Sequence, residues 1–105
     1  MSLSQICYFV AVAEEGHVGR AAQRLRVSQP PVTRSLRSLE AELGTPLFER
    51  TPRGMRLLPA GDVFLGHARR ILGAVDAARE AVASPASGAI TARAASSPAG
   101  DRLPR

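Results

Sequence analysis

Two consecutive prolines, Pro30 and Pro31, restrict where one helix of this chain can begin. Proline lacks a backbone N–H and its ring crowds the preceding turn, so a helix tolerates it only in the first turn. Ser28 precedes the pair and belongs to the residue types that cap helix N-termini. Apolar residues then recur at spacings of four, three and four: Val32, Leu36, Leu39 and Leu43. The pattern predicts an amphipathic helix that begins after Ser28 and ends at Gly44.

The side of this helix opposite the apolar residues is basic. At about 100° per residue, that side carries Pro30, Arg34, Arg37 and Ala41. The segment from His17 to Arg56 holds eight arginines and three acids, so its charge of 8 − 3 = +5 equals the net charge of the whole chain. A basic helix face suits an anionic partner such as nucleic acid. The alternative interpretation is that these arginines are simply hydrated and bind no partner.

Two further helices are predicted before this one. Ser2 and Gln5 have the spacing of a capping box, and Ile6, Phe9, Val10 and Ala13 follow at helical intervals until Gly16. A short helix over Arg20 to Leu25 fits next, with Gly19 as its N-cap. The short Arg26-Val27 connection then joins it to the basic helix, an arrangement typical of a helix-turn-helix that inserts its second helix into the DNA major groove.

A hairpin and a long helix are predicted after the basic helix. The runs Leu47 to Arg50 and Met55 to Leu58 flank a turn of residues 51–54, which indicates a wing with Arg53 near its tip. Pro59 suits the first turn of a helix of about 24 residues. Apolar residues on this helix alternate by four and three: Phe64, Ala68, Ile71, Val75, Ala78 and Val82. Such a seam is typical of helices that pair with a second helix, so we expect these six residues to form a dimer contact.

The sequence offers no basis for catalysis or metal binding. Cys7 is the single cysteine and is expected to be a packing residue, while His17 and His67 have no partners at metal-ligand spacing. We therefore expect no enzyme activity, no metal and no cofactor. No apolar run reaches the roughly 18 residues needed to span a membrane, and the N-terminus does not resemble a signal peptide, so we expect a cytoplasmic protein without membrane contact.

The order of these motifs resembles the N-terminal region of LysR-type transcriptional regulators. The resemblance covers residues 1 to about 83 and lies in YFVAVAEEG (8–16), AAQRLRVSQPPVTRSLRSLEAELGTPLFER (21–50), AG (60–61) and HARRIL (67–72). Four positions depart from the usual pattern: Val18, Gly19, Ser35 and Leu58. Of these, Gly19 and Leu58 weaken expected helix caps, and Ser35 could alter sequence preference.

The resemblance implies a mainly α fold: a winged helix-turn-helix of three helices and a two-stranded wing, followed by a long dimerisation helix. It implies contacts to base edges or phosphates from residues at the start of the basic helix: Gln29, Pro30, Pro31, Thr33 and Arg34. We expect the DNA-binding surface to include Ser28, Arg37 and Arg50 as well, and Arg53 at the tip of the wing to suit the narrow, negative minor groove. For Arg50, a phosphate contact and a structural ion pair are both open, as they are for Arg56. The expected partner is double-stranded DNA, bound by a homodimer.

Three segments follow from these patterns. Residues 1–58 are expected to form the DNA-binding domain, with the helix-turn-helix at about 18–37, and residues 59–83 the linker helix. In residues 84–105, 15 of 22 residues are Ala, Ser, Pro or Gly, so we expect a disordered remnant of an effector domain with no small-molecule site.

Three functions fit this organisation. The first is a sequence-specific regulator that binds an interrupted inverted repeat as a dimer. The second is a truncated interaction module that forms heterodimers with a longer relative and interferes with it. The third is an architectural DNA binder without sequence preference.

Overall fold

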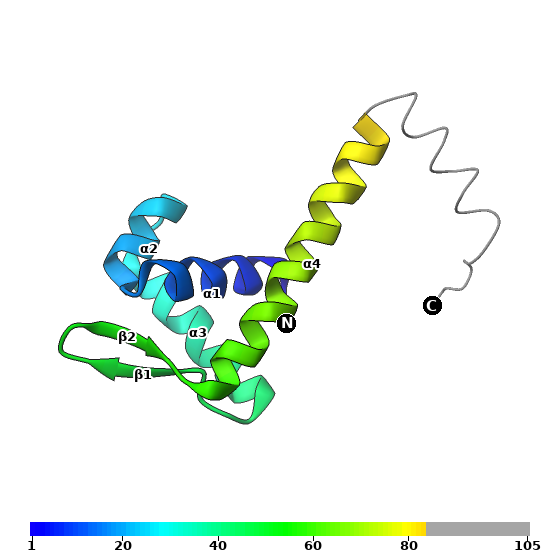
Figure 1. Cartoon of the computed structure of the whole chain (residues 1–105). Helices are drawn as coiled ribbons and strands as arrows, with labels where there is room; N and C mark the ends of the chain where they lie inside the picture. The colour runs from blue at the N-terminus through cyan, green and yellow to red at the C-terminus, as the bar shows by residue number, and fades with distance from the viewer. Residues whose placement is uncertain (84–105) are drawn as a thin grey trace. The chain divides into compact units, whose positions relative to one another are not determined.

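The computed structural model describes residues 1–83, and the prediction for residues 84–105 lies outside them. Four helices and a two-stranded sheet follow one another along the chain (Figure 1): α1 Leu3–Glu15, α2 Val18–Leu25, α3 Gln29–Leu43, β1 Phe48–Thr51, β2 Gly54–Leu57 and α4 Pro59–Ala83. The mainly helical winged helix-turn-helix predicted from the sequence is confirmed.

Helix α1 begins and ends as predicted. The Ser2 hydroxyl accepts a hydrogen bond from the Gln5 backbone N–H at 3.1 Å, and the Gln5 side chain accepts one from the Ser2 N–H at 3.0 Å. Gly16 then ends the helix with φ at 69°, a left-handed conformation that only glycine adopts without strain. Both ends of α1 are therefore fixed by local residues.

The predicted start of α2 was wrong. The helix begins at Val18 rather than Arg20, and its N-cap is His17 rather than Gly19. The Nδ1 atom of His17 accepts hydrogen bonds from the backbone N–H groups of Gly19 at 3.0 Å and Arg20 at 3.4 Å. The imidazole nitrogen thus gives two backbone N–H groups of the first turn a hydrogen-bond acceptor. Glycine has no side chain and could not provide one.

Helix α3 begins after Ser28 as predicted, but the Ser28 side chain makes no capping hydrogen bond. A capping side chain accepts from the N–H of the second or third helical residue. In α3 these residues are Pro30 and Pro31, which have no N–H to donate. Ser28 holds the N-cap position through its extended backbone alone, and its side chain stays exposed.

The core is built around Phe9, which is fully buried. The centre of its ring lies 4.9 Å from the centre of the Phe64 ring, in an edge-on arrangement, and 5.3 Å from the centre of the Phe48 ring. The chain has only these three phenylalanines, and together they join α1, β1 and α4. Pairs of this kind contribute about 0.5–1.5 kcal/mol beyond the area they bury.

The wing is a hairpin closed by the two residues Pro52 and Arg53. Its strands are shifted by one residue from the predicted runs: Phe48 pairs with Leu57, and Thr51 pairs with Gly54. The backbone N–H of Met55 donates to the carbonyl oxygen of Gly16 at 3.0 Å. The second strand is therefore bound to the turn between α1 and α2.

Helix α4 covers the predicted range, but its apolar seam does not act as one surface. Ala68 is fully buried and Phe64 partly buried in the chain's own core, and with Leu72 they place the first part of α4 in a compact unit of Met1–Leu72. Ile71 is 38% exposed and Val82 is 82% exposed. The seam predicted as a single dimer contact is thus divided between the core and the surface.

Glu14 connects three helices of this unit. Its carboxylate lies 2.8 Å from the guanidinium of Arg24 on α2 and 3.1 Å from that of Arg69 on α4. Hydrogen bonds from Arg24 and Arg69 lower the pKa of Glu14, although its burial opposes them.

Within the described residues, no helix is long and apolar enough to cross a membrane.

Candidate nucleic-acid interface

Helix α3 has one buried face and one exposed face. Val32, Leu36 and Leu39 are buried, as predicted. Leu43, the last of the predicted apolar residues, is 36% exposed because the helix ends there and Gly44 turns the chain away. On the other face, Pro30, Arg34, Arg37 and Ala41 are all exposed, so the recognition surface predicted from the sequence is accessible.

The acids near this surface are engaged elsewhere. Glu49 forms an ion pair with Arg56 across the wing, where the two residues face each other in the register. Of the two roles open for Arg56, the ion pair is the one that the wing forms. The remaining candidate arginines form no salt bridge within residues 1–83: Arg34, Arg37, Arg50 and Arg53. Their positive charge is therefore not neutralised by the described part of the chain.

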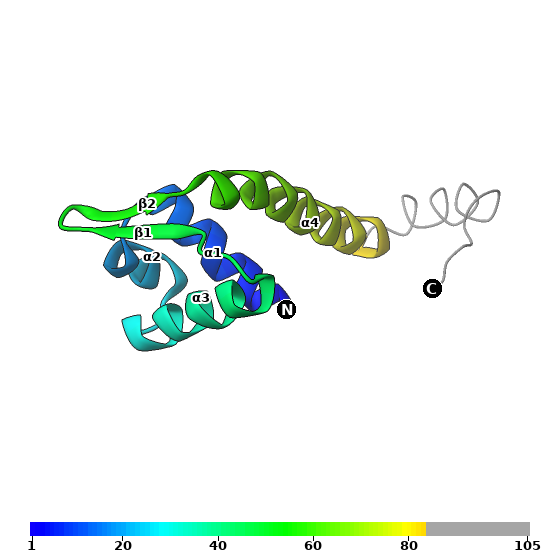
Figure 2. The same cartoon turned by 90° about the horizontal axis from the view of Figure 1, so that it is seen from below.

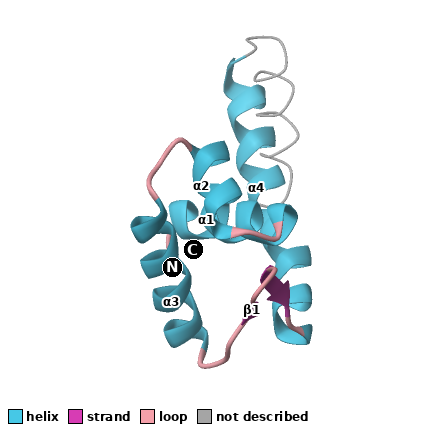
Figure 3. Cartoon of the chain, turned by 90° about the vertical axis from the view of Figure 1, so that its left-hand side faces the viewer, coloured by secondary structure: helices cyan, strands magenta, loops and turns pink. Residues whose placement is uncertain are grey.

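The wing and the start of α3 lie at the same end of the molecule (Figure 2). Viewed toward that end, α3 lies on one side and β1 of the wing on the other (Figure 3). A groove of about 190 Å³ lies between them, and its lining includes Thr33 and Arg37 from α3 and Arg50 from the wing. The structure thus brings three of the predicted contact residues together.

A second groove, of about 220 Å³, continues from the wing toward α2. Its lining includes Gln29, Arg50, Thr51 and His17. Arg50 therefore borders both grooves and lies between the wing and α3. Arg34 borders neither groove, and Arg53 occupies the turn of the wing, so the structure leaves these two arginines apart from the grooves.

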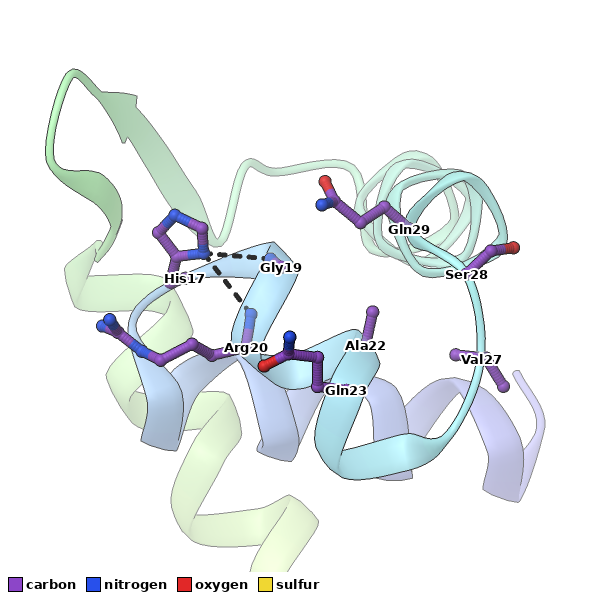
Figure 4. Close-up of a pocket in the computed structure, with 8 residues that line it drawn as sticks. All are labelled: His17, Gly19, Arg20, Ala22, Gln23, Val27, Ser28 and Gln29. Atoms are coloured by element: carbon purple, nitrogen blue, oxygen red, sulfur yellow. Dashed lines mark hydrogen bonds between the residues drawn. The ribbon is translucent and has the colours of Figure 1, made fainter.

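A third hollow, of about 450 Å³, separates α2 from the start of α3 (Figure 4). Eight residues line it: His17, Gly19, Arg20, Ala22, Gln23, Val27, Ser28 and Gln29. Sequence patterns predict Ser28 and Gln29 as contact residues, but they do not indicate Arg20, Gln23 or His17. In the sequence His17 suggests only a metal ligand, and its position just before the apolar Val18 is the signal that could identify it as a helix cap.

Glu40 holds the wing in place against α3. One oxygen of its carboxylate, Oε2, accepts hydrogen bonds from the backbone N–H groups of Leu47 at 2.7 Å and Phe48 at 3.2 Å. These groups lie at the start of β1 and are partly buried. Because α3 carries Glu40, the carboxylate fixes the wing relative to α3, and both grooves are lined by residues of these two elements.

We expect Glu40→Ala to lower the free energy of unfolding by about 2 kcal/mol, because a charged acceptor is lost and two N–H donors are left without a partner. Chemical denaturation of the folded protein measures this change. Glu42→Ala is the matched control, since Glu42 is exposed and pairs only with the N-terminal ammonium group. Equal stability of the two variants would show that Glu40 does not hold the wing.

A sequence profile described as "Bacterial regulatory helix-turn-helix protein, lysR family" matches residues 3–62 of this chain. Among curated proteins, the chain is 53% identical over 79 residues to the HTH-type transcriptional regulator ClcR of Pseudomonas putida, covering 75% of this chain and 27% of that protein. It is 60% identical over 72 residues to the regulator TfdS of Cupriavidus pinatubonensis, covering 69% and 24%. The chain thus spans about a quarter of the length of these relatives.

Solved structures resemble the fold as well. The CbnR DNA-binding domain in complex with DNA superposes with a TM-score of 0.71 at 49% identity, covering 80% of this chain and all of that one. The BenM DNA-binding domain in complex with benA site 1 DNA gives a TM-score of 0.74 at 39% identity, covering 78% of this chain and 95% of that one. The relatives named here are transcriptional regulators, and none is described as an enzyme.

Proposed function

Since this chain belongs to the LysR family of bacterial regulatory helix-turn-helix proteins, we propose that it recognises a specific DNA sequence and regulates transcription in the bacterial cytoplasm. The observation that carries the proposal is the exposed face of α3, where Arg34 and Arg37 have no acidic partner within the described residues. The DNA complexes of CbnR and BenM support it, because their DNA-binding domains share this fold. No observation on residues 1–83 favours the heterodimer module or the architectural binder.

The contact residues divide by the part of DNA that each would meet. Six residues at the start of α3 would enter the major groove, where their side chains would meet base edges or phosphates: Ser28, Gln29, Pro30, Pro31, Thr33 and Arg34. Arg37 and Arg50, on either side of one groove, would meet phosphates. Arg53, in the turn of the wing, would enter the narrow and electronegative minor groove.

The dimer would form through the part of α4 that the core does not use. Ile71, Ala78 and Val82 are exposed and Val75 is half-buried, and their spacing of four, three and four keeps them on one side of the helix. Two copies paired in this way would present two recognition helices to one side of a duplex. The preferred target would then be an inverted repeat interrupted by a spacer.

Selection of bound fragments from a random DNA pool tests the proposal. We expect enrichment of an inverted repeat whose half-sites are separated by about one helical turn or a multiple of it. Enrichment of a single half-site would contradict the dimer, and a pool without any enriched sequence would contradict specific recognition.

We expect Arg34→Ala to weaken binding to the selected duplex by about 1–3 kcal/mol per copy and to relax the preference at one base position, because a bidentate contact to guanine carries that much discrimination. Titration against duplexes varied one base pair at a time measures both effects. Arg70→Ala, an exposed arginine of α4, is the control and should bind normally. A loss of equal size on random DNA would assign Arg34 to a phosphate instead.

We expect Arg53→Ala to weaken binding to selected and random duplexes alike. A contact in the minor groove neutralises phosphate charge, so its removal should reduce the salt slope of the binding constant by about one unit. Titrations at a series of salt concentrations measure the slope. An unchanged slope together with unchanged affinity would remove the wing from the interface.

A further inference from the structure

His17 uses one ring nitrogen as the N-cap of α2. Nδ1 accepts hydrogen bonds from the backbone N–H groups of Gly19 and Arg20, at 3.0 and 3.4 Å. A nitrogen that accepts carries no proton, so a neutral imidazole in this position has its proton on Nε2. The cap therefore selects one tautomer and turns Nε2–H into a hydrogen-bond donor.

This donor faces away from its own helix. In Figure 4 the second ring nitrogen of His17 points away from α2, and the Gln29 side chain lies beyond Gly19 from the ring. His17 is exposed, and Nε2 has no hydrogen-bond partner within residues 1–83. The residue borders both the hollow between α2 and α3 and the groove that reaches the wing. The donor is thus available to a ligand that covers these two surfaces.

Gly19 allows the ring to lie close to the recognition helix. A Cβ atom at Gly19 would stand 3.0 Å from Cε1 of His17 and 3.2 Å from Nε2 of Gln29. The imidazole and the Gln29 amide therefore lie on either side of Gly19, and a side chain at this position would make tight contact with both.

We propose that His17 contacts the DNA backbone, with Nε2–H donating a hydrogen bond to a phosphate oxygen beside the bases that Gln29 meets. The inference rests on the proposed function, because it requires α3 to lie in the major groove. A phosphate contact fixes the register of the protein on the duplex without reading sequence. A neutral donor releases no counterion, so this contact differs from those of the arginines in leaving the salt dependence unchanged.

His17→Ser separates the two roles of this residue. Serine is a good N-cap for the N–H groups of Gly19 and Arg20, but its hydroxyl is too short to reach the place of Nε2. We expect an unchanged melting temperature. The affinity for DNA should be about tenfold weaker per copy, because one hydrogen bond to a charged acceptor is lost. The loss should be equal on the selected duplex and on a random duplex, and the salt slope should not change.

Two further variants sharpen the test. His17→Asp also caps the helix but places a carboxylate near the phosphate, so it should fold normally and bind more weakly than His17→Ser. His67→Ser removes the other histidine, which lies on α4 and borders neither groove, and it should bind as the unchanged protein does. Full affinity in His17→Ser would overturn the proposal and leave His17 as a cap only.

Other outcomes also overturn it. A loss confined to the selected duplex would assign His17 to a base edge, and a reduced salt slope would mean that the ring binds as an imidazolium ion. Failure of the unchanged protein to select any sequence would instead refute the proposed function, and this result is seen before any variant is made.

Discussion

Gly61→Ala should lower the free energy of unfolding by about 3 kcal/mol, which is at the upper end of what overpacking costs. Gly61 is buried in the first turn of α4. A Cβ atom there would stand 2.2 Å from the carbonyl oxygen of Leu47 and 2.7 Å from Cδ1 of Leu57. The carbonyl belongs to the backbone and also accepts the N–H of Leu58 at 2.9 Å. It cannot move aside without separating the helix from the wing.

Gly66→Ala is the matched control on the same helix. A Cβ atom at Gly66 meets nothing within 4 Å, so only the helix propensity of the two residues differs. Alanine should therefore raise the stability by about 0.5–1 kcal/mol. Urea denaturation of both variants gives the comparison, and a Gly61→Ala protein as stable as Gly66→Ala would show that α4 does not pack against Leu47 as described.

Helix ends were predicted where a residue type has one dominant use. Gly16 and Gly44 end α1 and α3 because a left-handed residue is needed there, and the prolines of α3 restricted its start. The cap of α2 was missed because histidine is not among the preferred capping residues. The hydroxyl of Ser28 failed as a cap because the two prolines that marked the helix also removed its donors. Residue propensities alone could not predict the histidine cap of α2 or the missing side-chain cap of α3, because both depend on which backbone N–H groups lie within reach.

Apolar spacing predicted the apolar side of α4 but not which of its residues pack into the chain's own core. Phe64 and Ala68 pack into the chain's own core, whereas Ile71 and Val82, at equivalent positions of the same pattern, are exposed. A periodic seam has the same appearance whether the second surface is a neighbouring helix or another chain. Only the position of Phe9, which lies far away in the sequence, decides the role of Phe64.

Sequence reasoning found the exposed face of the recognition helix, because a helix of known phase fixes which residues are opposite its apolar side. It could not find the grooves that flank this helix. Arg50 borders two of them because Glu40 draws the start of β1 onto α3, a contact between residues seven and eight positions apart. Arg56, on the second strand of the wing, faces Glu49 instead. The different roles of the two arginines follow from strand register.

Dimerisation provides the remaining test with a large expected effect. We expect Val75→Asp to yield a monomer, because an aspartate in a helix contact would have to lose its hydration without gaining a partner. The affinity for the selected inverted repeat should fall by about a hundredfold or more, since the second half-site would no longer be bound as part of the same complex. Sedimentation velocity gives the mass, and titration against full and half sites gives the affinities.

Ala77→Asp is the control for Val75→Asp, because it adds the same charge to the same helix at an exposed position. Two residues further along the helix place Ala77 about 200° from Val75, on the side away from Ile71 and Val82. This variant should remain a dimer and keep its affinity for the inverted repeat. Half-site affinity should be the same in both variants, because neither change touches α3 or the wing. If Val75→Asp sediments as a dimer, the exposed part of the α4 seam is not the dimer contact. If both variants dissociate, added charge on α4 rather than burial of the seam is the cause.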